Sequence, residues 1–117
     1  MFNLVVCNKK LFINNITMII TKLLDQAKTF NFIKLQFFLV FFFGILYYII
    51  GNHIGNKNSH FVDNVPPFQL IDALYLSLVT HSTVGYGDIA PRSNIARIVA
   101  SLQMLTIIFS FALYFVA

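Results

Sequence analysis

Three apolar stretches of unequal length follow one another along the C-terminal two thirds of the chain. Residues 31–50 and residues 98–117 each have the length that a helix needs to cross a bilayer, roughly 20 apolar residues. The stretch between them, residues 68–81, would reach only ~20 Å as a helix, well short of the ~30 Å hydrocarbon core. The pattern therefore predicts an all-α membrane protein, in which two transmembrane helices flank a short re-entrant helix.

The N-terminal third has a different pattern. Residues 11–30 place apolar side chains at helical spacing and polar side chains, lysines among them, on the other face. The apolar positions are Phe12, Ile16, Ile19, Leu23, Ala27 and Phe30. After a short tail of residues 1–10, this predicts an amphipathic helix that lies at the membrane interface. A third transmembrane helix is the alternative, which Asn14, Asn15 and Lys22 disfavour because they interrupt the apolar run too soon.

Two polar segments separate the apolar stretches and are predicted to be outer loops. Residues 51–67 contain glycines, asparagines and a Pro–Pro pair, and residues 89–97 contain a further proline. His53 and His60 have no second ligand at a suitable spacing, so we expect solvated side chains rather than a metal site. Cys7 is the single cysteine and is expected to be a free thiol, with palmitoylation as the alternative.

Composition favours a lipid environment, and the distribution of charge gives the chain a direction in it. Hydrophobic residues make up 58% of the chain and charged residues 10%, against about 25% charged in typical globular proteins. Residues 1–34 contain five lysines and one aspartate, which accounts for the whole net charge of +4. Basic residues just before an apolar span favour a cytoplasmic N-terminus over a nucleic-acid-binding surface. With two spans, we expect a multi-pass protein whose C-terminus is cytoplasmic as well.

A glycine-rich run, Thr83-Val84-Gly85-Tyr86-Gly87-Asp88, follows the short apolar stretch. Glycine tolerates positive φ, so such a run can turn successive carbonyls toward one axis. Together with Thr80-His81-Ser82 before it and Ile89-Ala90-Pro91 after it, the run closely resembles the selectivity filter of potassium channels. Residues 66–111 resemble the pore module of that family. In so short a chain, the resemblance is strongest to the miniature potassium channels of large viruses that infect algae.

The resemblance implies a potassium-selective channel with a defined role for each segment. It implies that residues 11–30 act as a slide helix, residues 68–81 as the pore helix and residues 82–88 as the filter. Residues 98–117 then form the inner helix. A viral channel of this kind would be located in a host membrane and also in the virion membrane.

The chemistry of ion passage explains why such a filter needs several chains. A potassium ion can enter an apolar layer only if oxygen ligands replace its hydration water. The predicted ligands are the Thr83 hydroxyl and the backbone carbonyls of Thr83, Val84, Gly85 and Tyr86, with Gly85 and Gly87 providing backbone freedom. One strand cannot surround an ion, but four can, so we predict a homotetramer. The C-terminal end of the short helix carries partial negative charge, which favours a cation below the filter.

Ser82, Tyr75 and Asp88 are predicted to support the filter. Many members of the family place a carboxylate behind the filter, bonded to the residue equivalent to Asp88, but Val79 stands at that position here. We therefore expect Asp88 to bond to Tyr75 or to a donor in the outer loop. His81 is expected to pack behind the filter, with pH sensing as the alternative.

The inner helix offers two faces to the pore. Gln103, Thr106 and Ser110 form a polar face, and Met104, Ile108, Phe111 and Phe115 form an apolar one. The resemblance implies that the apolar face around Ile108 and Phe111 lines the cavity, and the polar face then bonds across helices. Phe111 or Phe115 is the predicted hydrophobic constriction that gates by dewetting. Many members also have a hinge glycine in this helix, which Ile107 or a neighbour replaces here, so sharp bending is not expected.

Two other classes of function remain open. The basic N-terminal helix would suit a membrane-disrupting protein, and a subunit that needs a partner chain is the third possibility. An enzyme is not expected, because Asp63, Asp72 and Asp88 have no nearby base and no nucleophile–histidine pair appears. The expected partners are further copies of the chain, lipid and K+, with no cofactor and no nucleic acid.

Overall fold

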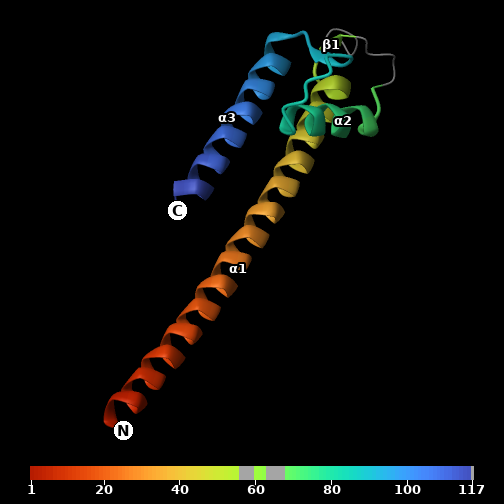
Figure 1. Ribbon diagram of the computed structural model, residues 1–117. Coiled ribbons are helices and arrows are strands. Elements are labelled where there is room, and N and C mark those ends of the chain that lie inside the picture. The colour runs from red at the N-terminus through yellow and green to blue at the C-terminus, as the bar shows by residue number, and fades with distance from the viewer. Residues whose placement is uncertain (56–59, 63–67, 117) are drawn as a thin grey trace. The chain divides into compact units, whose positions relative to one another are not determined.

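The computed structural model describes residues 1–55, 60–62 and 68–116. Contacts divide the chain into two units, residues 1–34 and residues 35–117, and each is described separately. In these described ranges the elements follow the order helix, strand, helix, strand, helix (Figure 1). Their bounds are α1 (Phe2–His53), β1 (Phe61–Val62), α2 (Leu70–His81), β2 (Ala90–Pro91) and α3 (Asn94–Val116).

The first unit consists of the N-terminal part of α1. The helix begins at Phe2, so the residues expected to form a tail are helical instead. No proline or glycine occurs before Gly44, and nothing in this stretch interrupts the helical hydrogen bonds. The consecutive side chains of Leu11, Phe12 and Ile13 are all exposed, so apolar surface extends around more than one side of the helix. Its location at the membrane interface stays a prediction.

The second unit contains both expected spans and the short helix between them. α2 begins two residues later than expected, and α3 begins four residues earlier, at Asn94. Ser93 explains the early start of α3, because its hydroxyl accepts a hydrogen bond from the Ala96 N–H at 3.2 Å and so caps the first turn. Two helices, α1 and α3, are long and apolar enough to cross a membrane.

Small residues let α2 pack closely in the core of the second unit. Tyr47 of α1, Ala73 of α2 and Ala96 of α3 are fully buried. A Cβ added at Gly44 of α1 would lie 2.6 Å from Leu74 Cδ2 of α2, so the two helices approach closely at that point. Figure 1 shows α2 beside the C-terminal part of α1, at the end where the strands lie.

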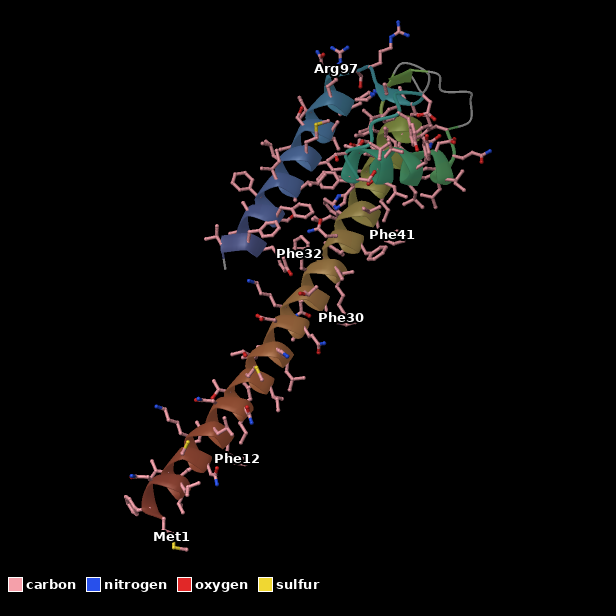
Figure 2. All side chains as sticks on the ribbon, viewed as in Figure 1. Met1, Phe12, Phe30, Phe32, Phe41 and Arg97 are labelled. Carbon is pink, nitrogen blue, oxygen red and sulfur yellow. The ribbon has the colours of Figure 1, made fainter. Side chains whose placement is uncertain are left out.

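A short antiparallel bridge, which was not predicted, joins the two loops that the pattern assigned to the outer side. Phe61 of β1 pairs with Pro91 of β2. The backbone oxygen of the neighbouring His60 accepts a hydrogen bond from the Arg92 N–H at 2.7 Å. Arg97 marks the start of α3 at this same end of the unit in Figure 2.

The expectation that His60 is solvated is wrong, whereas His53 is exposed as expected. His60 is 6% exposed, and its Nδ1 lies 2.8 Å from the Ser93 hydroxyl. Its Nε2 bonds to the backbone oxygen of Ile54. The burial follows from the strand pairing, which carries residue 60 inward and positions it to fasten the first outer loop to the start of α3.

Candidate functional site

Residues with positive φ alternate with residues of ordinary φ along the glycine-rich run. Thr83, Gly85 and Gly87 have φ values of 62°, 57° and 80°, and the residues between them do not share this conformation. In an ordinary strand successive peptides point to opposite sides, but alternating handedness can turn successive carbonyls to the same side. The sequence predicted this freedom at the two glycines. It did not predict the positive φ of Thr83, which costs about 1–2 kcal/mol in a residue with a Cβ.

The last turn of α2 holds the N-terminal end of the run. The Thr83 N–H donates to the Thr80 oxygen at 3.2 Å, and the Gly85 N–H reaches the Val79 oxygen at 3.4 Å. Ser82, an expected support residue, donates its hydroxyl to the same Val79 oxygen at 3.2 Å. These bonds use carbonyls that a helix end leaves without helical partners. The helix end therefore determines where the run begins and helps to keep Thr83 in its disfavoured conformation.

A tyrosine–aspartate contact lies at the C-terminal end of the run. The Tyr75 hydroxyl donates to Asp88 Oδ2 at 2.7 Å, so Tyr75 rather than a loop residue is the donor. This hydrogen bond raises the pKa of the Tyr75 phenol, which therefore stays protonated and able to donate at neutral pH. Val79, the residue that stands behind the run where the resemblance implied a carboxylate, is buried. The contact joins the middle of α2 to the C-terminal end of the run.

A cavity of about 250 Å³ opens beside the run, and its lining residues are Val79, Thr80, Thr83, Gly85 and Met104. Met104 is the member of the predicted apolar face of α3 that reaches this cavity. The three gate candidates lie outside its lining, and in the single chain Ile108, Phe111 and Phe115 are 64%, 43% and 78% exposed. Their role as cavity wall or gate stays a prediction.

The polar face of α3 forms hydrogen bonds to other helices at two positions, Gln103 and Ser110. Gln103 is fully buried, and its Oε1 accepts a hydrogen bond from the Tyr47 hydroxyl of α1 at 2.7 Å. Its Nε2 donates to the Ser77 oxygen of α2 at 3.0 Å. Ser110 accepts from Gln36 Nε2 at 3.0 Å. Two of the three residues thus bond across helices as predicted, whereas Thr106 donates to Leu102 of its own helix.

His81 packs at the end of α2, immediately before the run. It is partly buried, and its Nε2 lies 2.7 Å from Gln36 Oε1 of α1. The same Gln36 therefore contacts both α2 and α3. Sequence reasoning missed Gln36, because a single glutamine near the end of an apolar span resembles an interfacial polar residue. Only the packing of the three helices brings its partners together.

Comparison with known proteins identifies the class of molecule. Residues 35–117, the whole of the second unit, match the model of a family described as "Ion channel". The match covers more than half of the chain, and the chain belongs to this family of membrane channels, which is not a family of enzymes. The two apolar helices and the short helix between them agree with that assignment. No solved structure matches the chain.

Several potassium channels are similar to the chain. The potassium channel protein kcv of Paramecium bursaria Chlorella virus 1 is 28% identical over 93 residues, which span 79% of this chain and 94% of the viral protein. Potassium channel AKT2/3 of Arabidopsis thaliana is 29% identical over 85 residues. These residues span 67% of this chain and 11% of the plant protein. Two pore potassium channel a of Oryza sativa subsp. japonica is 30% identical over 77 residues, or 20% of its length. The chain thus corresponds to a small part of the plant channels and to nearly all of the viral one.

Proposed function

We propose that the protein is a potassium-selective channel that conducts K+ passively. The observation that carries the proposal is the alternating handedness of Thr83, Gly85 and Gly87 at the end of a short helix between two candidate spans. A backbone of this form can present a column of carbonyl oxygens to a dehydrated cation. The similarity to proteins named as potassium channels, among them a viral protein matched over nearly its full length, supports the choice of ion.

The proposed ligands of K+ are the Thr83 hydroxyl and four backbone carbonyls, those of Thr83, Val84, Gly85 and Tyr86. A desolvated ion needs oxygens on all sides, so four chains would form a homotetramer around one axis. In the single chain the side chains of Val84 and Tyr86 are 55% and 72% exposed, which leaves them available to neighbouring copies. The end of α2 adds partial negative charge on the inner side.

The proposed orientation follows from charge. Lysines before the first span favour a cytoplasmic N-terminus, and the second span returns the chain to the cytoplasm. The run then enters the membrane from the outer side, with Tyr86 toward the outside and Thr83 toward the inner cavity. The N-terminal part of α1 would lie along the cytoplasmic surface, and the host or virion membrane is the proposed location.

Recording from purified protein in a planar bilayer tests the proposal. With a tenfold K+ gradient and sodium replacing the missing potassium, a selective channel reverses near the potassium equilibrium potential, about 59 mV from zero. The rival membrane-disrupting function predicts reversal near zero, because a lesion conducts sodium as well. The need for a partner chain predicts no current from this protein alone. Either of the last two outcomes would refute the proposal.

A further inference from the structure

A chain of hydrogen bonds crosses all three helices at the level of the inner end of the filter. His81 of α2 lies 2.7 Å from Gln36 of α1, which in turn lies 3.0 Å from Ser110 of α3. The Ser110 hydroxyl donates to the Ile107 oxygen at 2.8 Å. The two gaps in sequence, 45 and 74 residues, show that the fold itself assembles this connection.

The Ile107 carbonyl at the end of this chain of hydrogen bonds determines which group donates in each of them. A backbone carbonyl only accepts, so the hydroxyl of Ser110 uses its hydrogen on Ile107 and must accept from the Gln36 amide N–H. The amide oxygen of Gln36 then faces His81, whose Nε2 carries the hydrogen. The other ring nitrogen, Nδ1, is buried and has no hydrogen-bond partner among the described residues. His81 is therefore a neutral donor toward Gln36.

The connection ends two residues before the most strained part of the filter. Thr83 has φ of 62°, and the bonds that hold it and Gly85 come from Thr80 and Val79 in the last turn of α2. Any movement of that turn moves the first carbonyl ring. A second connection between the helices lies at Tyr47, whose hydroxyl donates to Gln103 of α3, and Gln103 donates in turn to Ser77 of α2. The connection through Gln36 differs from it because it reaches α2 at His81, two residues before Thr83.

We propose that Gln36 is a positioning residue for ion selection, one that fixes the inner carbonyl ring by tying His81 to the inner helix at Ser110. The inference rests on the proposed function, since it concerns the filter of a potassium channel. It assigns to a residue of the first span a role in selectivity, although that residue contacts neither the ion nor the filter strand. Motion of α3 is coupled through Ser110 and Gln36 to the last turn of α2.

Three variants of the full chain separate the parts of the tie. Gln36→Leu replaces the amide by an apolar group and so removes both of its hydrogen bonds. Ser110→Ala removes only the bond to α3. Gln36→Glu retains an oxygen that accepts from His81 but loses the N–H that donates to Ser110, so it leaves the bond to His81 alone. Thr106→Val is the matched control, because the Thr106 hydroxyl bonds only to Leu102 within α3.

The measurement is the reversal potential of single channels with potassium on one side and sodium on the other. Reversal potential does not depend on how many channels fold, so it separates positioning from stability. We expect Gln36→Leu to raise the sodium-to-potassium permeability ratio by at least roughly threefold, because it removes two hydrogen bonds and the loss of one already allows a change of that size. Ser110→Ala and Gln36→Glu should each give a smaller rise, because each keeps the bond to His81, and Thr106→Val should match the unaltered protein.

Two results would overturn the inference. The first is Gln36→Leu channels with unaltered reversal potential and conductance, present only in lower number, which would make Gln36 purely structural. If Gln36→Leu forms no channels, Ser110→Ala decides, and an unaltered permeability ratio in that variant refutes the tie. Failure of the proposed function has a different signature, because the unaltered protein would then ignore the potassium gradient.

Discussion

At the scale of single residues, the filter depends on backbone conformation more than on side-chain contacts. A Cβ added at Gly85 would meet nothing within 4 Å, yet the residue has φ of +57°. The same holds at Gly87, with φ of +80°. Within the single chain, steric crowding by neighbouring atoms is therefore not the reason for glycine at these two positions. The requirement is the left-handed conformation, which an L-residue with a Cβ adopts at a cost of about 1–2 kcal/mol.

Gly85→Ala is expected to abolish or greatly reduce selective potassium current. Alanine disfavours the left-handed conformation that turns the neighbouring carbonyls, at a cost of about 1–2 kcal/mol in each chain. Because the cost recurs in each of the four copies, the population of the conducting form falls strongly. The measurement is single-channel current under a potassium gradient. Semisynthetic replacement by d-alanine is the control, since a d-residue favours positive φ. An L-alanine variant with unaltered selective current would contradict the reading of this position.

Tyr75→Phe is expected to destabilise the outer end of the filter. It removes the 2.7 Å hydrogen bond to Asp88 while preserving the ring. We expect shorter open times and lower conductance, with Tyr48→Phe as a control on another tyrosine. The raised pKa of Tyr75 gives a pH dependence as well. The stabilisation is fully present below the ordinary tyrosine pKa of about 10 and is lost as the pH rises through the raised value. Open times of Tyr75→Phe equal to those of the unaltered chain would contradict this role.

The residue scale also shows the limits of sequence reasoning. The positive φ at glycines and the Tyr75–Asp88 contact could be predicted, because both follow from local motif chemistry and a short helix. The burial of His60 could not, since it depends on pairing between two outer loops some 30 residues apart. The Gln36 contacts with His81 and Ser110 could not either, because they require the relative placement of three helices.

At the scale of elements, α2 is held where glycines of α1 allow close approach. A Cβ at Gly44 would lie 2.6 Å from Leu74 Cδ2, the flexible end of a side chain. A Cβ at Gly51 would lie 2.4 Å from Phe68 Cδ1, part of a rigid ring. That ring stacks on Phe61 with 4.8 Å between centroids, so it has little freedom to move aside. The sequence predicted the helices and their order, but not which glycines serve the packing between them.

The two glycines should therefore respond differently to alanine. Gly51→Ala is expected to destabilise the folded protein by about 1–3 kcal/mol, the usual cost of overpacking. Gly44→Ala should cost much less, because Leu74 can rotate and alanine favours the helix by about 1 kcal/mol over glycine. Denaturant unfolding in detergent micelles measures the difference. Equal effects of the two variants, or a more stable Gly51→Ala protein, would contradict the packing described for Phe68.

At the scale of the whole molecule, a single chain leaves unusually large apolar surfaces uncovered. Along α3, Ile98, Ile108 and Phe109 are 60%, 64% and 64% exposed. Large exposed apolar surface marks contact with a membrane or with another protein chain. Lipid and further copies of the chain are the covers that membrane proteins use. Composition and charge predicted this environment, since both are properties of the sequence as a whole. The change of pattern along the sequence predicted a boundary between residues 30 and 31, and contacts divide the chain between residues 34 and 35, within α1.

Sharing of one pore among four chains gives a prediction at this scale. Equal amounts of unaltered and Gly85→Ala protein, mixed in denaturant and refolded together into liposomes, would contain about one sixteenth all-unaltered tetramers if subunits assemble at random. Selective potassium flux should then fall to about that fraction, because one distorted strand breaks every carbonyl ring of the filter. Co-purification of untagged chains with a tagged Gly85→Ala variant verifies that mixed assemblies form, and mixing with Thr106→Val serves as the control. A fall of only one half would mean that each chain conducts by itself, which would contradict the tetramer and the carbonyl rings together.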